Sequence, residues 1–153
     1  MKNLRAPQYM AAAAMAVALG ANTLCHAQLG ATGRAPHDAK DAVVQRAQGG
    51  LLTYRETTDT YGIVVRQYAD AAGAVYAVSW RGPAMPDVKA LLGAYFQRFR
   101  DGASASAGDA GLHTARVADG ALVVENRTRL REFSGRAWLA NAFPPGVSAA
   151  DIQ

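Results

Sequence analysis

The stretch that decides the fold is PDVKALLGAYFQRFRDG, residues 86–102. It opens with Pro86-Asp87, which suits a first helical turn because Pro needs no N–H there and Asp lies at the positive end of the helix dipole. Apolar residues then recur with helical spacing and form one continuous stripe: Val88, Leu91, Leu92, Tyr95, Phe96 and Phe99. Gly102 supplies a stop. The pattern predicts one amphipathic helix that buries its stripe against another layer.

Short segments rich in β-branched and aromatic residues stand on both sides of this helix. Asp70-Ala-Ala-Gly73 predicts a tight turn, and therefore an antiparallel hairpin. In the strand that ends at Trp80, alternation places Tyr76 and Val78 on the same face as Trp80. The order predicts an α+β fold, a mostly antiparallel sheet of about five to six strands with one amphipathic helix packed on it. The expected strands are 51–57, 62–69, 74–80, 112–117, 121–125 and 130–139.

The N-terminus has the pattern of an export signal. Two basic residues precede the uncharged run Met10–Leu19, and small side chains at Cys25 and Ala27 suit a signal peptidase. This run is too short for a transmembrane helix, which needs roughly 20 apolar residues. We therefore predict cleavage between Ala27 and Gln28, a periplasmic or secreted protein, and no stable transmembrane anchor after cleavage.

The chain of 153 residues fits a single domain. We expect a signal peptide over 1–27, a flexible leader over 28–50, one α+β domain over 51–143 and an extended C-terminal tail over 144–153. The leader is rich in small residues, and a weak helix over 38–48 is the one element expected in it.

Composition excludes several kinds of chemistry. A single Cys rules out a disulfide framework and a multi-thiolate metal site. The net charge of +4 comes without a basic block or a nucleic-acid motif, so we expect no nucleic-acid partner. Outside the signal, His37 and His113 are the sole imidazoles, and no HExxH, GxSxG or phosphate-loop motif occurs. We therefore predict no catalytic residue, no cofactor and no metal site.

Two clusters remain as weak candidates for surface binding. The first is Trp80-Arg81, an aromatic residue beside a cation at a strand end, although the pattern favours Trp80 as a cap on the core next to the helix start. The second is a group of arginines around the last hairpin, which could grip a carboxylate, a phosphate or an acidic lipid, or could be a solvated turn. Its candidate residues are Arg129, Arg131 and Arg136, with Arg127 beside them.

Several stretches resemble the DUF2844 family, exported proteobacterial proteins of unknown function. They cover most of the chain after the signal: Val65–Tyr68, Val75–Pro83, Pro86-Asp87, Leu91–Phe96, Leu122–Glu125, Phe133–Trp138, Pro145–Ser148 and Asp151-Ile152. The resemblance implies export and a single domain, and it implies no activity.

The function that we predict is therefore a binding or accessory module of the cell envelope, non-enzymatic, whose partner is an unknown envelope protein or ligand. The alternative is a periplasmic hydrolase-like enzyme that uses a carboxylate and an arginine. Glu125 or Glu132 with Arg136 would supply those groups, because all three fall in the expected last hairpin.

Overall fold

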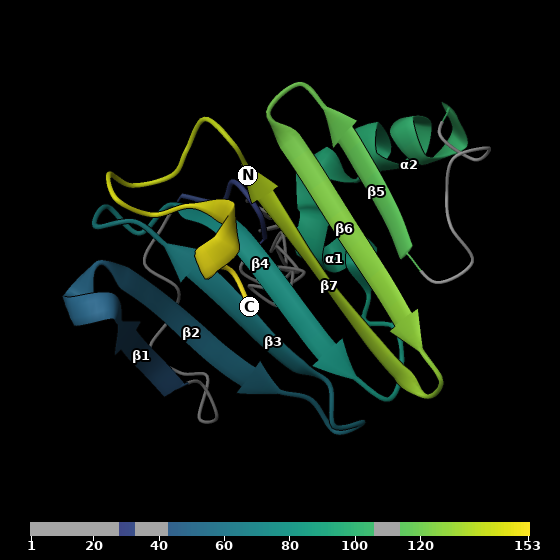
Figure 1. Cartoon of the computed structure of the whole chain (residues 1–153), viewed down its shortest axis with the longest axis horizontal. Helices are drawn as coiled ribbons and strands as arrows, with labels where there is room; N and C mark the ends of the chain where they lie inside the picture. Colours follow the sequence, from purple (N-terminus) through teal and green to yellow (C-terminus); the bar gives the residue numbers. More distant parts are fainter. Residues whose placement is uncertain (1–27, 33–42, 106–113) are drawn as a thin grey trace, which may run out of the picture.

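The structure is a computed structural model that describes residues 28–32, 43–105 and 114–153. Its centre is an antiparallel sheet of seven strands in the order β1-β2-β3-β4-β7-β6-β5 (Figure 1). The strands are β1 (Val43–Ala47), β2 (Leu52–Thr58), β3 (Val64–Ala69), β4 (Val75–Gly82), β5 (Thr114–Asp119), β6 (Leu122–Arg129) and β7 (Glu132–Leu139). The α+β class is confirmed, but the expected strand number was too low. The sequence missed β1 because its segment contains few large apolar residues.

The predicted helix is confirmed and covers one face of the sheet (Figure 1), but the stop expected at Gly102 was wrong, because α2 continues through this residue to Ala105. The Asp87 side chain caps its start by accepting the backbone N–H of Ala90 at 3.0 Å. Gly93 interrupts it, because a φ of +53° lies outside the helical region. The helix therefore consists of α1 (Val88–Leu92), a 3₁₀ turn (Gly93–Tyr95) and α2 (Phe96–Ala105).

The predicted apolar stripe faces the sheet despite the break at Gly93. Leu91 and Leu92 are buried, and the other four stripe residues pack against the same core cluster. The sheet contributes to this cluster with alternate residues of its central strands: Val75, Val78, Trp80, Leu122, Val124, Ala137 and Leu139. The helix thus closes a continuous apolar layer.

One side-chain direction in β4 differs from the prediction. The register of β3 against β4 shifts after Tyr68, as in a β-bulge, so Tyr76 is the extra residue of β4. As a result Tyr76 and Ala77 both pack on the face away from the helix, whereas Val78 and Trp80 lie beneath it. The strict alternation expected for Tyr76, Val78 and Trp80 was therefore wrong at Tyr76.

The C-terminal segment, residues 143–153, returns over the other face of the sheet (Figure 1). Val147 and Ile152 are buried there, and Phe143 meets the Tyr76 ring edge-on with centroids 5.6 Å apart. This segment includes one short 3₁₀ turn, η3 (Ala149–Asp151). The segment expected to be an extended tail is therefore packed on the domain.

Part of the expected leader also belongs to the folded domain. Leu29 is buried in the helix-side core, and its N–H donates to the carbonyl of Leu91 at 2.9 Å. Gly30 donates to the Val75 carbonyl at 2.8 Å. Within the weak helix expected over 38–48, residues 43–47 form β1 instead, and residues 38–42 lie outside the described part.

Candidate functional site

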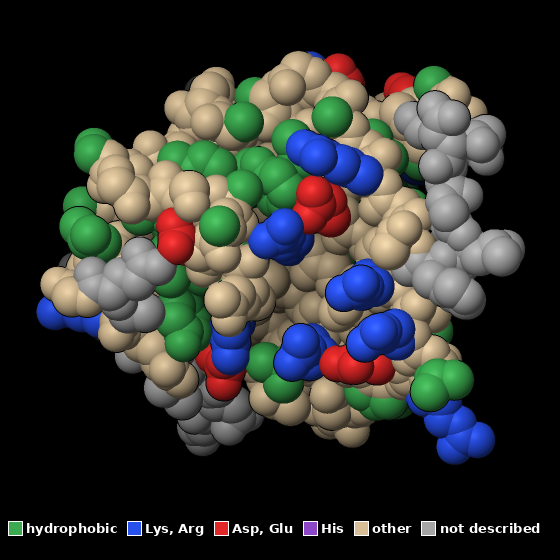
Figure 2. All heavy atoms as spheres, in the orientation of Figure 1, with side chains coloured by type: hydrophobic (Ala, Val, Ile, Leu, Met, Phe, Trp, Pro, Cys, Tyr) green, Lys and Arg blue, Asp and Glu red, His purple; other side chains and the backbone are tan. Residues whose placement is uncertain are grey.

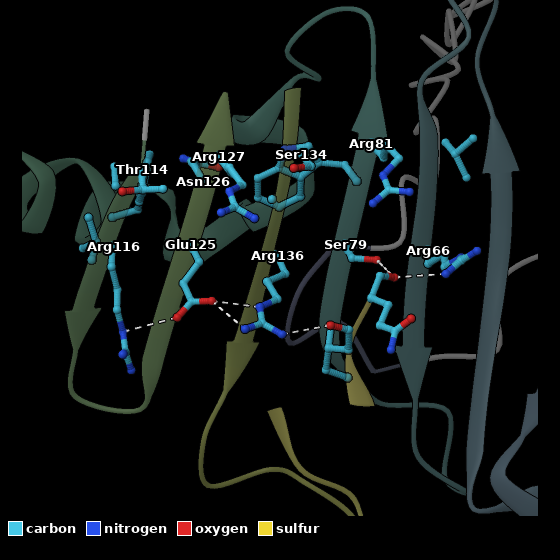
Figure 3. A pocket seen from close by; sticks show the side chains of 18 of the residues that line it. Arg66, Ser79, Arg81, Thr114, Arg116, Glu125, Asn126, Arg127, Ser134 and Arg136 are labelled. Atoms are coloured by element: carbon cyan, nitrogen blue, oxygen red, sulfur yellow. Dashed lines mark hydrogen bonds and ion pairs between the residues drawn. The ribbon is translucent and has the colours of Figure 1, made fainter. Parts of the chain in front are cut away.

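The sheet face opposite the helix changes character along its strands. Beneath the C-terminal segment it is apolar, with Leu52, Tyr68 and Trp138 among the buried residues. Further along the strands, a row of polar side chains crosses β2, β3, β4, β7, β6 and β5 in register. We call Glu56, Arg66, Ser79, Arg136, Glu125 and Arg116 the charged row. Figure 3 shows its members from Arg66 to Arg116 side by side on their strands.

A second row follows two residues further toward the end of the sheet, on the same face. Its cations are Arg81 on β4 and Arg127 on β6, and both are opposite Ser134 of β7. Thr114 of β5 is opposite Arg127 and completes the row. We call these four residues the outer row. Hydroxyl groups therefore alternate with guanidinium groups at this level of the sheet (Figure 3).

Ion pairs across neighbouring strands organise the charged row. Glu125 is shared between Arg136, with N–O distances of 2.8 Å, and Arg116, at 3.5 Å. On the far side of the row, Arg66 Nε binds Glu56 Oε2 at 2.7 Å. The hydrogen bond that Arg66 donates to Glu56 raises the pKa of Arg66, so this guanidinium stays charged. Three cations thus share two carboxylates.

Arg136 also holds the C-terminal segment against the sheet. Its Nη1 donates to the carbonyl oxygens of Ala149 at 2.9 Å and Ile152 at 3.0 Å. Beside it, the buried Ser79 hydroxyl donates to the main-chain oxygen of Gln153 at 2.6 Å. Arg66 Nη1 donates to the same Gln153 oxygen at 3.2 Å, but its side chain remains 36 % exposed. The middle of the charged row is therefore committed to structure, and a ligand can reach the partly exposed flanks and the outer row.

The two rows line an open groove of about 1190 Å³. Five arginines and two glutamates line it, which gives the lining a surplus of positive charge. Figure 2 shows Lys and Arg side chains gathered around the central hollow of this face. The Arg127 side chain is exposed and has no hydrogen bond or ion pair among the described residues. An exposed guanidinium without an internal partner is able to bind a carboxylate or a phosphate.

The structure separates the candidates that the sequence grouped together. Arg81 and Arg136 line the groove, whereas Arg129 and Arg131 lie beyond it at the β6–β7 turn. Trp80 is 3 % exposed and packs in the helix-side core, which agrees with the capping alternative. Ala27, His37 and His113 lie outside the described residues, and Gln28 is the first residue within them.

Sequence reasoning missed most of the groove, in particular Arg66, Ser79 and Arg116. A signal existed for Arg116, because counting back through the Asp119-Gly120 turn pairs it with Glu125. No such count was possible for Arg66 and Ser79. They join the row because β4 pairs with β7, which is distant in the sequence.

The structure brings together only some of the residues that a hydrolase-like enzyme would use. Glu125 does meet Arg136, but Glu132 lies with Arg81 at 3.0 Å instead. The two groove carboxylates, Glu56 and Glu125, stand four strand spacings apart, roughly 19 Å. Paired carboxylates in glycoside hydrolysis stand about 5–10 Å apart. Within the described ranges, no cluster of three or more His, Cys, Asp or Glu side chains could hold a metal ion.

The fold and the groove define a small α+β domain with one antiparallel sheet, a helix on one face and an arginine-lined groove on the other. The DUF2844 family, described as "Protein of unknown function", matches residues 25–152, and the chain belongs to this family. No curated protein and no solved structure matches the chain significantly. In the part of the chain that the structure describes, we find no helix of the length and hydropathy needed to span a bilayer.

Proposed function

We propose that this protein is an exported binding module of the cell envelope, non-enzymatic, and that the groove holds an elongated anionic ligand with carboxylate or phosphate groups. The observation that carries the proposal is the excess of guanidinium over carboxylate in an open groove. Arginine presents a planar fork of donors that fits both anions, and the bonds are strengthened by charge.

The arrangement of the groove supports a ligand that is longer than a single anion. Arg66 on β3 and Arg116 on β5 stand at its two flanks, four strand spacings or roughly 19 Å apart. Arg127, Ser134 and Thr114 provide donors between the flanks. A ligand that crosses the strands would therefore meet several donors in succession.

Export is the second part of the proposal. Leu29 is the first buried residue in the described part of the chain, and the exposed Gln28 stands immediately before it. Cleavage after Ala27 would keep Leu29 and Gly30, whose N–H groups donate to Leu91 and Val75. Mass spectrometry of the protein from its native cell should find a chain that begins at Gln28. A chain that keeps residues 1–27 would contradict this part.

Calorimetric titration with inorganic tripolyphosphate tests the groove, since this soluble polyanion carries several phosphates in a row. We expect the protein to bind it and salt to weaken the binding. Arg127→Gln should reduce the affinity on the order of tenfold, because one charged hydrogen bond is lost. It should leave the fold intact, because Arg127 holds no other described residue.

Arg98→Gln is the matched control, since Arg98 lies on α2 outside the groove. It removes the same charge from the protein, so any general effect of net charge appears in both variants. Equal losses in both variants, or no binding of the wild type, would overturn the groove as the binding site.

A further inference from the structure

Three large apolar side chains are exposed at the end of the sheet where β2, β4 and β6 finish. They are Tyr61 in the β2–β3 turn (76 % exposed), Met85 after β4 (45 %) and Leu130 in the β6–β7 turn (101 %). These turns lie at one end in Figure 1 because their strands run in the same direction. Among the described residues, the other exposed large hydrophobic residue is Leu51, which precedes β2 at the opposite end.

Leu130 is held in a conformation that disfavours its own side chain. It has a φ of +49° and is the single non-glycine residue with positive φ in the described ranges. Arg129 pairs with Glu132 across it, so the turn has two residues, and glycine or asparagine is usual at such a position. A leucine there gains nothing from the fold, since its side chain is fully exposed. An outlier of this kind points to an external contact.

Cations surround this exposed leucine. Arg129 and Arg131 flank it in sequence, and Arg127 precedes them on β6. None of the three side chains has a hydrogen bond or ion pair to another described residue. They are therefore available to an anionic partner at the same place as Leu130.

Acidic groups at this end are already engaged. Asp59 accepts the backbone N–H groups of Tyr61 at 2.8 Å and Ile63 at 2.9 Å, which also fixes the tip that carries Tyr61. Asp87 caps α1. Glu132 lies 3.0 Å from Arg81, which offsets its charge. These hydrogen bonds leave Asp59 and Asp87 charged, but neither residue lies in the β6–β7 turn, where Arg129 and Arg131 have no ion pair in the described residues.

We infer that this end of the sheet docks on an anionic lipid surface. Leu130 would enter the interface, Arg129 and Arg131 would contact lipid phosphates, and Tyr61 and Met85 would add apolar contact along the same edge. The turns are separated by about three strand spacings, or roughly 14 Å, so they can touch one flat surface together. This inference goes beyond the proposed function, because none of the five residues lines the groove.

Sedimentation with lipid vesicles tests this inference. The wild type should bind vesicles that contain phosphatidylglycerol more tightly than vesicles of phosphatidylcholine alone, and salt should reduce the difference. Leu130→Gly should weaken binding about fivefold to tenfold, because the apolar contact is lost. Glycine tolerates positive φ, so loss of folding cannot explain that result. Arg129→Gln combined with Arg131→Gln should weaken binding on the order of tenfold.

Leu51→Ala is the matched control, since it removes an exposed leucine from the opposite end, and its binding should stay within about twofold of wild type. All variants carry the same N-terminus, so any contribution of the apolar run at residues 10–19 cancels. Unchanged binding by Leu130→Gly would overturn the inference. If Arg127→Gln and Arg116→Gln abolished vesicle binding while Leu130→Gly did not, the lipid would occupy the groove, which would refute the docking end and leave the proposed function standing.

Discussion

The two faces of the sheet differ in how completely they are covered. On the helix face, apolar residues from four strands lie beneath the stripe of α1 and α2 and beside Leu29. On the other face, the C-terminal segment covers one half of the strands, and the charged and outer rows occupy the rest. The helix is long enough to close its face, whereas the C-terminal segment is not. The uncovered strip is where the groove forms.

The comparison teaches that alternate residues of one strand can serve separate purposes. In β7, Ala137 and Leu139 build the helix-side core, whereas Ser134 and Arg136 line the groove. Side chains on successive residues point to opposite faces, so a substitution should affect one purpose without the other. The predictions below use this separation.

The largest effect is expected at the centre of the helix face. Leu92 has no exposed surface, so Leu92→Ala should lower the free energy of unfolding by about 2–5 kcal/mol, because burial is lost and a cavity remains. Arg100→Ala, on the exposed side of α2, should change it by less than about 0.5 kcal/mol. Thermal and urea unfolding would measure both. Equal stability of Leu92→Ala and wild type would mean that the helix does not close this face.

The helix face was predictable because its signal is local. Six apolar residues at helical spacing and a capping aspartate identify the helix and the stripe that it buries. The break at Gly93 and the bulge at Tyr76 were not predictable, since each depends on a distant segment. A side chain at Gly93 would collide with that of Gln28, and the bulge is defined by the pairing with β3.

The groove was less predictable because its residues come together through pairing between distant strands. Counting residues across the two short hairpin turns could pair Arg116 with Glu125, and Glu125 with Arg136. The other half of the row depends on the pairing of β4 with β7 and on the return of the C-terminal segment. Neither feature leaves a periodic signal in the sequence.

The next largest effect is expected at the boundary between the two halves of the groove face. Arg136→Met removes the pair with Glu125 and the bonds to the Ala149 and Ile152 carbonyls. We expect the free energy of unfolding to fall by about 1–3 kcal/mol, and amide hydrogen exchange in residues 147–152 to become faster. Arg127→Met should leave both quantities unchanged. Matching losses in the two variants would contradict the division between a structural and a ligand-facing arginine.

Alkaline pH should lower stability by a smaller amount, through Tyr76 in the half of the groove face that the C-terminal segment covers. Burial raises the pKa of Tyr76 to about 12, so the folded state keeps its phenol neutral while the unfolded chain ionises from about pH 10. The unfolded state then binds fewer protons. The contribution of Tyr76 to stability should be constant below pH 9 and should fall by up to about 1.4 kcal/mol per pH unit between pH 10 and 12.

Tyr76→Phe isolates this contribution from the other tyrosines. The Tyr76 hydroxyl is buried without a hydrogen-bond partner in the described residues, so its removal should not lower stability at pH 7. Thermal unfolding of both proteins between pH 9 and 11 should show a shallower decline for Tyr76→Phe. Parallel declines would place the alkaline loss on other groups.

The smallest effect is expected where the helix meets the edge of the sheet. Arg98 of α2 and Asp119 of β5 lie 3.1 Å apart, but their side chains are 49 % and 42 % exposed. Water and salt screen such a pair, so a double-mutant cycle to alanine should give a coupling of about 0.2–1 kcal/mol that shrinks at high salt. The same cycle on Glu125 and Arg136 should give a larger value, because that pair is about one third exposed. A coupling at Arg98 as large as that in the groove would mean that ion pairs support both faces equally, whereas the packing predicts that the helix is held mainly by apolar contact.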